Sequence, residues 1–80
     1  MEKIVIPELG EGIQKATVAF WHCKIGDFVK AGDDMVELVT DKASFNVPSH
    51  CEGILKSIMA KEGEEINIGA VLAFIDPISK

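Results

Sequence analysis

An internal repeat limits the folds that this chain can adopt. When the sequence is shifted by 37 residues, Ala16–Val39 lies over Gly53–Asp76 without a gap. In each copy, two glycines six residues apart enclose an acidic residue and a Val or Ile, which is typical of a turn, a short strand and a second turn. The matched pairs are Lys24/Lys61, Gly26/Gly63, Gly32/Gly69, Val18/Leu55, Trp21/Ile58, Val29/Ile66, Met35/Leu72 and Leu38/Ile75. Two unrelated β-hairpins can also share such features, so the repeat is a hypothesis.

The start of each half repeats at a different offset. "KIVIPELGEG" (Lys3–Gly12) lies over "SFNVPSHCEG" (Ser44–Gly53) with a shift of 41. The difference between the two shifts, 41 minus 37, places a four-residue insertion in the first half, beside Gly12. The insertion falls in the loop "ELGEGIQK", Glu8–Lys15, and breaks the symmetry there.

The local pattern predicts an all-β chain. Short apolar runs alternate with Gly, Asp, Glu and Pro, and no segment of useful length shows helical periodicity. Two similar halves predict a pseudo-twofold flattened barrel or sandwich. The expected strands are 3–6, 16–23, 28–29, 34–40, 44–47, 53–59, 65–66 and 71–75. The expected core is Val18, Trp21, Val29, Leu38, Val47, Leu55, Ile58, Ile66, Leu72 and Phe74.

Composition excludes some classes of function. The 80 residues suit one domain. The net charge of −5, with eight lysines and no arginine, argues against nucleic acid binding and is compatible with a partner that has a basic surface. No apolar run is long enough to cross a bilayer, and the N-terminus lacks the long apolar segment of a signal peptide, so we expect an intracellular protein and no membrane partner.

The cysteines fit a reducing compartment. Cys23 and Cys51 are expected to be free thiols there. Each follows a histidine, as His22-Cys23 and His50-Cys51, but neighbouring residues in a strand point to opposite faces. We therefore expect neither a metal site nor a disulfide.

A lysine stands where the chain is expected to reverse direction. The strands 34–40 and 44–47 would form a hairpin with Asp41 and Lys42 at its two central positions. Asp-Lys fits a type I turn, in which both central residues have negative φ. The repeat places this turn and the chain termini at opposite ends of the domain. A projecting lysine can simply be solvated and discourage aggregation.

Taken together, the motifs resemble a known family. The order "IPELGEGI", "ATVAFWHCKIGDFVKAGD", "VELVTDKASFNVPS", "GILKSI" and "EGEEINIGAVLAFID" is similar to that of the lipoyl domain of the E2 (dihydrolipoamide acyltransferase) component of 2-oxo acid dehydrogenase complexes. The resemblance covers about Ile4 to Asp76. It implies a flattened β-barrel, or barrel-sandwich hybrid, of two four-stranded antiparallel sheets with quasi-twofold symmetry and a lysine at a hairpin tip.

The resemblance also implies a site and a role. It assigns lipoic acid, in amide linkage, to Lys42, and it gives Asp41 and Ala43 the task of defining the turn that a modifying enzyme reads. It assigns partner recognition to the loop beside this turn, whose residues here are Glu8, Leu9, Gly10, Glu11, Gly12, Ile13, Gln14 and Lys15. Two positions depart from the common pattern, because Val39 and Asn46 stand where many relatives have an acid.

The implied mechanism is that of a non-catalytic swinging-arm carrier within an acyltransferase chain. The carrier shuttles acyl groups and reducing equivalents between a thiamine-diphosphate-dependent E1, the E2 catalytic core and the flavin-containing E3, dihydrolipoyl dehydrogenase. A lipoate ligase or lipoyl transferase would attach the cofactor, which supplies the chemistry. The isolated domain is expected to be a monomer. The resemblance does not fix the 2-oxo acid; pyruvate dehydrogenase is among the complexes it allows.

Two other functions stay open. Biotinyl carrier domains share this fold but typically have Met-Lys-Met at the turn, and an unmodified hybrid-sandwich module could bind or space partners. We expect a domain at 1–76 and a tail or linker at 77–80, cut from a longer chain. The bacterial cytoplasm is the expected location, with the mitochondrial matrix as the alternative.

Overall fold

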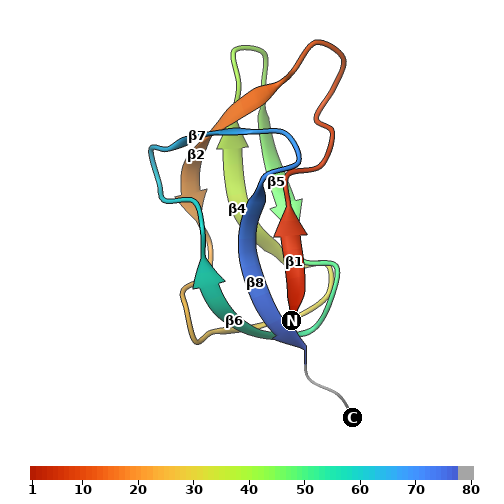
Figure 1. Cartoon of the computed structure of the whole chain (residues 1–80), viewed down its shortest axis with the longest axis vertical. Helices are drawn as coiled ribbons and strands as arrows, with labels where there is room; N and C mark the ends of the chain where they lie inside the picture. Colours follow the sequence, from red (N-terminus) through yellow and green to blue (C-terminus); the bar gives the residue numbers. More distant parts are fainter. Residues whose placement is uncertain (78–80) are drawn as a thin grey trace.

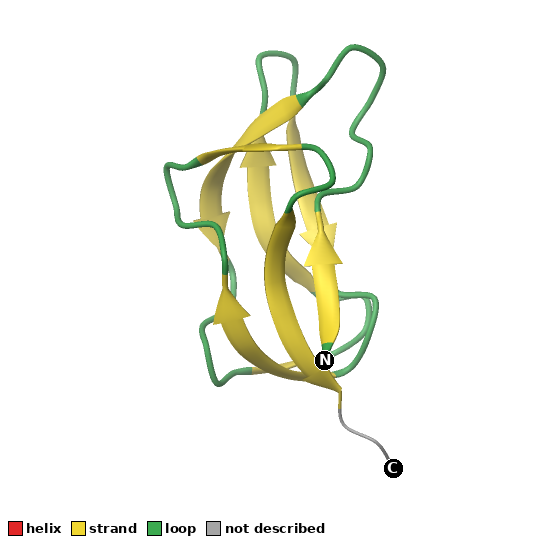
Figure 2. Cartoon of the chain, in the orientation of Figure 1, coloured by secondary structure: helices red, strands yellow, loops and turns green. Residues whose placement is uncertain are grey.

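Eight strands form two antiparallel sheets in the computed structural model, which describes residues 1–77 (Figure 1). Figure 2 shows strands joined by loops and turns throughout the described part of the chain. The strands are β1 (Glu2–Val5), β2 (Lys15–Trp21), β3 (Phe28–Val29), β4 (Asp34–Val39), β5 (Ser44–Pro48), β6 (Gly53–Ile58), β7 (Glu65–Asn67) and β8 (Val71–Pro77). The all-β prediction is confirmed, and each expected strand is present within about two residues of its expected bounds.

The strand order demonstrates the twofold relation between the halves. One sheet has the order β1-β8-β6-β3 and the other has the order β5-β4-β2-β7. Exchanging β1–β4 with β5–β8 in sequence order converts the first sheet into the second. Each sheet therefore contains two strands from each half, and neither half can form a sheet of this kind alone.

Local details repeat in the same way. The register of β2 on β4 shifts between Val18 and Phe20, and that of β6 on β8 shifts between Leu55 and Ser57, which is 37 residues later. The amide of Gly26 donates to the Leu55 carbonyl at 2.8 Å, and the amide of Gly63 donates to the Val18 carbonyl at 2.7 Å. The repeat predicted from the sequence thus extends to β-bulges and single hydrogen bonds.

The core lies between the two sheets. Six of the expected core residues are buried, namely Val18, Val29, Leu38, Val47, Leu55 and Leu72. The buried set also contains Ile4, Ile6, Ala16, Met35, Val36, Ala60, Ala73 and Ile75, which we did not predict. Trp21, Ile58 and Ile66 are only partly buried and pack against this core.

Phe74 was wrongly predicted to lie in the core. Alternation from Leu72 would point Phe74 inward, but the register of β1 on β8 shifts opposite Leu72. Leu72 and Ala73 are therefore both buried, Ile75 follows them inward, and Phe74 is only half-buried, paired with Ser57.

The predicted turn lies at one end of an elongated molecule with extents of 40 × 21 × 17 Å, and the N-terminus and the end of β8 lie at the other. In Figure 1 the β4–β5 loop is at the top, and the N-terminus and the end of β8 are at the bottom. β8 ends at Pro77, one residue beyond the expected boundary at 76. Residues 78–80, expected to be a tail or linker, lie outside the described residues. No helix in the described chain is long and apolar enough to cross a membrane.

Candidate functional site

Lys42 lies at the tip of the β4–β5 hairpin, in the turn Thr40–Ala43. The Thr40 amide donates to the Ala43 carbonyl at 2.9 Å and closes the turn. Asp41 and Lys42 are exposed, and no residue other than glycine has positive φ in the described chain. Both central residues therefore have the negative φ that we predicted, and the lysine side chain projects from a closed loop.

Thr40 holds this turn together, and sequence reasoning missed it. Its Oγ1 accepts the amide hydrogen of Lys42 at 3.2 Å and that of Ala43 at 3.1 Å. The same hydroxyl donates to the Ala43 carbonyl at 3.0 Å. A hydroxyl offers one donor and two lone pairs, so Thr40 uses its whole hydrogen-bonding capacity within the turn. A Thr directly before Asp-Lys was the available signal, because Ser and Thr bond amides two and three residues on.

Asp41 and Ala43 contribute less to the turn than we expected. The Asp41 carboxylate forms no hydrogen bond within residues 1–77, and Ala43 takes part through its backbone. Their side chains are exposed, so they can contact an enzyme directly but do not set the geometry of the turn.

A groove of about 280 Å³ separates the turn from the β1–β2 loop. The two loops stand at the same end of the molecule in Figure 1. A Cβ placed on Gly12 would lie 3.7 Å from the Lys42 Nζ, so the loop directly flanks the amine. The groove is lined by Gly12, Ile13, Gln14, Lys15, Thr40, Asp41, Lys42 and Glu65. The symmetry-breaking insertion thus borders the lysine, as the resemblance implied.

The β1–β2 loop is anchored by one side chain and closed at its tip. Leu9 packs against the core, so it supports the loop rather than presenting itself to a partner. The amide of Ile13 donates to the Gly10 carbonyl at 3.2 Å and closes a tight turn at the tip. Glu8, Glu11 and Gln14 are exposed.

Lys15 belongs to β2 rather than to the loop. It pairs with Asn67 across the strands, and its Nζ lies 3.5 Å from the Glu65 Oε1. This is the one ion pair among residues 1–77. The Lys42 ammonium is therefore not neutralised by a carboxylate of the described chain. Glu65 enters the groove from β7, and no sequence signal identified it.

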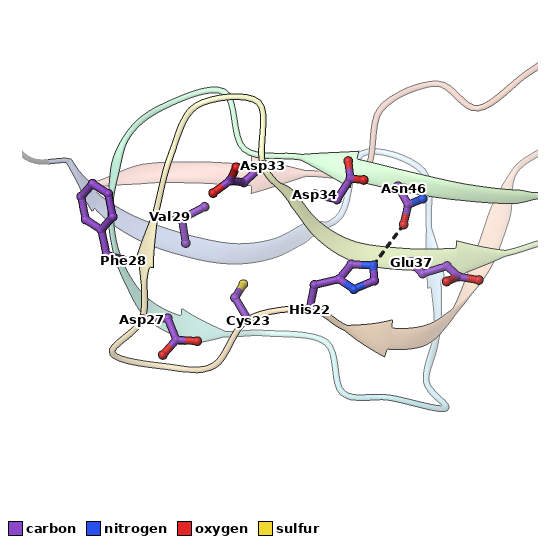
Figure 3. Close-up of a pocket in the computed structure, with 9 residues that line it drawn as sticks. All are labelled: His22, Cys23, Asp27, Phe28, Val29, Asp33, Asp34, Glu37 and Asn46. Carbon is purple, nitrogen blue, oxygen red and sulfur yellow. Dashed lines mark hydrogen bonds between the residues drawn. The ribbon is translucent and has the colours of Figure 1, made fainter.

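A second hollow lies away from this groove, where the segment that follows β2 meets β3, β4 and β5 (Figure 3). Figure 3 shows His22 turned toward Asn46, and the two side chains are joined by a 3.2 Å hydrogen bond. Burial, followed by the charges of Asp27 and Asp33, raises the pKa of the Cys23 thiol. These neighbours keep the thiol protonated, so Cys23 is a poor nucleophile.

The two His-Cys pairs contact different parts of the chain. The Cys23 Sγ approaches the Met35 carbonyl at 3.8 Å, whereas the His50 Nε2 contacts the Lys3 carbonyl at 3.1 Å. Cys23 and Cys51 are both free thiols. Within residues 1–77, no group of three or more His, Cys, Asp and Glu side chains could hold a metal ion.

Comparison with known proteins gives consistent matches. A family model described as "Biotin-requiring enzyme" matches residues 2–75. The dihydrolipoyllysine-residue acetyltransferase component of the pyruvate dehydrogenase complex from Acholeplasma laidlawii is 42% identical over 76 residues, which are 95% of this chain and 14% of that protein. The dihydrolipoyllysine-residue succinyltransferase component of the 2-oxoglutarate dehydrogenase complex from Buchnera aphidicola is 49% identical over 63 residues, which are 79% of this chain and 15% of that protein.

A solved structure matches over almost the whole chain. It is the solution structure of the lipoyl domain of the 2-oxoglutarate dehydrogenase complex from Azotobacter vinelandii, with a TM-score of 0.76 and 32% sequence identity. The match covers 95% of this chain and 96% of that domain. The chain thus matches nearly the whole of that lipoyl domain, whereas it spans only about a seventh of the two acyltransferases.

Proposed function

Because the chain belongs to the biotin/lipoyl family, whose model covers residues 2–75, we propose that it is a lipoyl carrier domain with lipoic acid joined to Lys42 by an amide bond. The observation that carries the proposal is the position of Lys42. This exposed lysine stands at the tip of a closed turn, at the end of the molecule opposite the N-terminus and the end of β8. The likeness to a lipoyl domain at 32% identity supports lipoic acid as the group.

The residues around Lys42 fit such a group. Glycine at position 12 leaves space beside Nζ, and no carboxylate of residues 1–77 pairs with it. An amine in this position can be reached by an enzyme from the solvent side. Amide formation removes one positive charge, and no ion pair of the described chain is lost with it.

The protein contributes presentation rather than catalysis. When bound, lipoic acid supplies a disulfide that accepts an acyl group together with two electrons and is afterwards reoxidised. The closed turn fixes the attachment point, while the long side chain leaves the reactive end mobile. Attachment of the rest of a longer chain at the opposite end would hold the arm at high local concentration among several active sites.

The partners follow from the complexes to which the relatives belong. The two relatives above are components of the pyruvate and 2-oxoglutarate dehydrogenase complexes, so both substrates stay open. We propose that this domain is acylated by a thiamine-diphosphate-dependent E1, delivers to an E2 core, and is reoxidised by E3. The exposed Glu8, Glu11 and Gln14, next to the lysine, are proposed to contact E1.

The proposed compartment is the bacterial cytoplasm, with the mitochondrial matrix as the alternative. The two free cysteines support a reducing compartment.

Acylation by E1 tests this function. The lipoylated domain is incubated with a purified E1 and either pyruvate or 2-oxoglutarate, and its intact mass is measured. We expect an acyl mass gain with one of the two acids, equal in the wild type and in Lys56→Arg, which alters another exposed lysine. Lys42→Arg should gain nothing. A lipoylated wild type that stays unacylated with both acids and their E1 enzymes would contradict the carrier role.

A further inference from the structure

We propose that Thr40 is a positioning residue for the modification of Lys42. The inference rests on the proposed function, because it concerns how the lipoyl-attaching enzyme finds its lysine. Thr40 acts through the backbone of the turn rather than by contact with the reacting atoms.

The hydrogen bonds of the turn support this role. Oγ1 accepts the amides of Lys42 and Ala43 at 3.2 and 3.1 Å and donates to the Ala43 carbonyl at 3.0 Å. The Thr40 amide adds a fourth bond, to the same carbonyl, at 2.9 Å. Three of the four bonds pass through one oxygen atom. Removal of that oxygen leaves the turn with one of these bonds.

No other side chain of the described turn can replace it. The Asp41 carboxylate forms no hydrogen bond within residues 1–77, and the Ala43 side chain is apolar. Thr40 is half-buried and lines the groove that also contains Gly12, so it lies on the side of the hairpin turn that faces the β1–β2 loop. The orientation of the Lys42 backbone therefore depends on this hydroxyl.

The modification reaction makes that orientation matter. The Lys42 Nζ, after losing a proton, attacks the carbonyl carbon of a lipoyl adenylate; the new C–N bond forms, the C–O bond to AMP breaks, and a second proton leaves the nitrogen. The enzyme must place Nζ against this carbon, so it has to hold the turn in one conformation. A turn that already has this conformation binds without an ordering cost.

The expected effect is on binding rather than on turnover. If only a fraction of the molecules have the competent turn, the apparent dissociation constant rises by the inverse of that fraction. Loss of the Oγ1 bonds should reduce the fraction to about one tenth, because a tenfold factor corresponds to about 1.4 kcal/mol and one net hydrogen bond is worth roughly that amount. KM for the domain should then rise about tenfold, with kcat unchanged.

The test compares Thr40→Val, Thr40→Ser and Thr17→Val as substrates of a lipoate ligase supplied with lipoic acid and ATP. Valine has the shape of threonine without its hydroxyl, and serine keeps the hydroxyl. Thr17→Val makes the same chemical change in β2, outside the turn. Urea unfolding followed by Trp21 fluorescence establishes that each variant is folded, and backbone ¹⁵N relaxation reports the order of the turn.

Thr40→Val should show the higher KM with normal kcat, and the order parameters of Lys42 and Ala43 should fall from about 0.85 to below about 0.6. Thr40→Ser should restore both quantities, and Thr17→Val should change neither. Equal KM values and equal order parameters in Thr40→Val and the wild type would overturn the inference and leave the carrier function intact. A folded wild type that the ligase does not modify would overturn the proposed function and this inference with it.

Discussion

Gly53 should be much more sensitive to the addition of one methyl group than the other glycines of this fold. It is the first residue of β6, it is buried, and it pairs with Val29 on one side and Pro77 on the other. A Cβ at this position would collide with the Asp76 carbonyl oxygen and would lie 2.8 Å from both the Ile75 Cγ2 and the Pro77 Cα. Two of these three atoms belong to the backbone of β8, so a change of rotamer cannot relieve the contact.

The magnitude follows from what must move. β8 would have to separate from β6, and these strands are paired from Gly53 to Ile58. Overpacking that forces a backbone shift costs about 3 kcal/mol. For a domain of this size each kcal/mol lowers Tm by roughly 4–8 °C, so Gly53→Ala should lower Tm by about 12–24 °C.

Gly63→Ala is the matched control. Gly63 has φ of +89° and nothing within 4 Å of the position of a Cβ. Its substitution costs only the strain of a left-handed residue, about 1–2 kcal/mol. The comparison therefore separates steric exclusion from backbone conformation.

The assay is thermal unfolding, for Tm, and urea unfolding, for the midpoint and m-value, both followed by the fluorescence of Trp21, the one tryptophan of the chain. Its indole Nε1 donates to the Ala60 carbonyl at 2.8 Å, so the signal reports native packing. The m-value should stay constant, and the midpoint should fall further in Gly53→Ala than in Gly63→Ala. If Gly53→Ala loses no more stability than Gly63→Ala, the steric reasoning is wrong.

Two further outcomes are expected. Burial and the charges of Asp27 and Asp33 raise the pKa of the Cys23 thiol, so Asp27→Asn should lower that pKa. Alkylation of Cys23 by iodoacetamide at pH 8, followed by peptide mass, should then be faster than in the wild type. An unchanged alkylation rate would contradict the charge effect. A raised pKa in the folded state means that folding favours the protonated thiol over the thiolate. The contribution of Cys23 to the free energy of unfolding is therefore present at neutral pH and is lost as the pH rises through the raised pKa. Replacement of the exposed Glu8 and Glu11 by lysine should slow acylation by E1, while the free energy of unfolding changes by less than about 0.5 kcal/mol. An unchanged acylation rate would show that these carboxylates do not contribute to the proposed contact with E1.

The internal repeat made most of the fold predictable. Matching Val18 with Leu55 and Gly26 with Gly63 predicted two equivalent halves, and the strand orders of the two sheets confirm them. The core was harder to predict than the fold, because a β-bulge changes which residues of a strand face inward. The position of a bulge depends on which residue has no partner in the neighbouring strand, and the sequence pattern does not show this. The register shift opposite Leu72 therefore reversed the expected positions of Ala73 and Phe74.

The position of the candidate site could be predicted from the sequence, but the side chains that form the turn and the groove around Lys42 could not all be predicted. The four-residue insertion indicated that the loop near Gly12 differs from its counterpart, and the structure places Gly12 beside the Lys42 Nζ. The roles of Thr40 and Glu65 could not be obtained in the same way. Thr40 acts through hydrogen bonds whose geometry exists only in the folded turn, and Glu65 reaches the groove from a strand distant in sequence.

The most direct test of the central claim is the intact mass of the domain after expression in cells supplied with lipoic acid. We predict a mass gain of one lipoyl group in the wild type and in Lys56→Arg, and no gain in Lys42→Arg. A gain that matches biotin would instead assign the chain to the biotinyl carriers of the same family. A folded wild type that gains no mass in the presence of a competent ligase would contradict the claim that Lys42 carries a lipoyl arm.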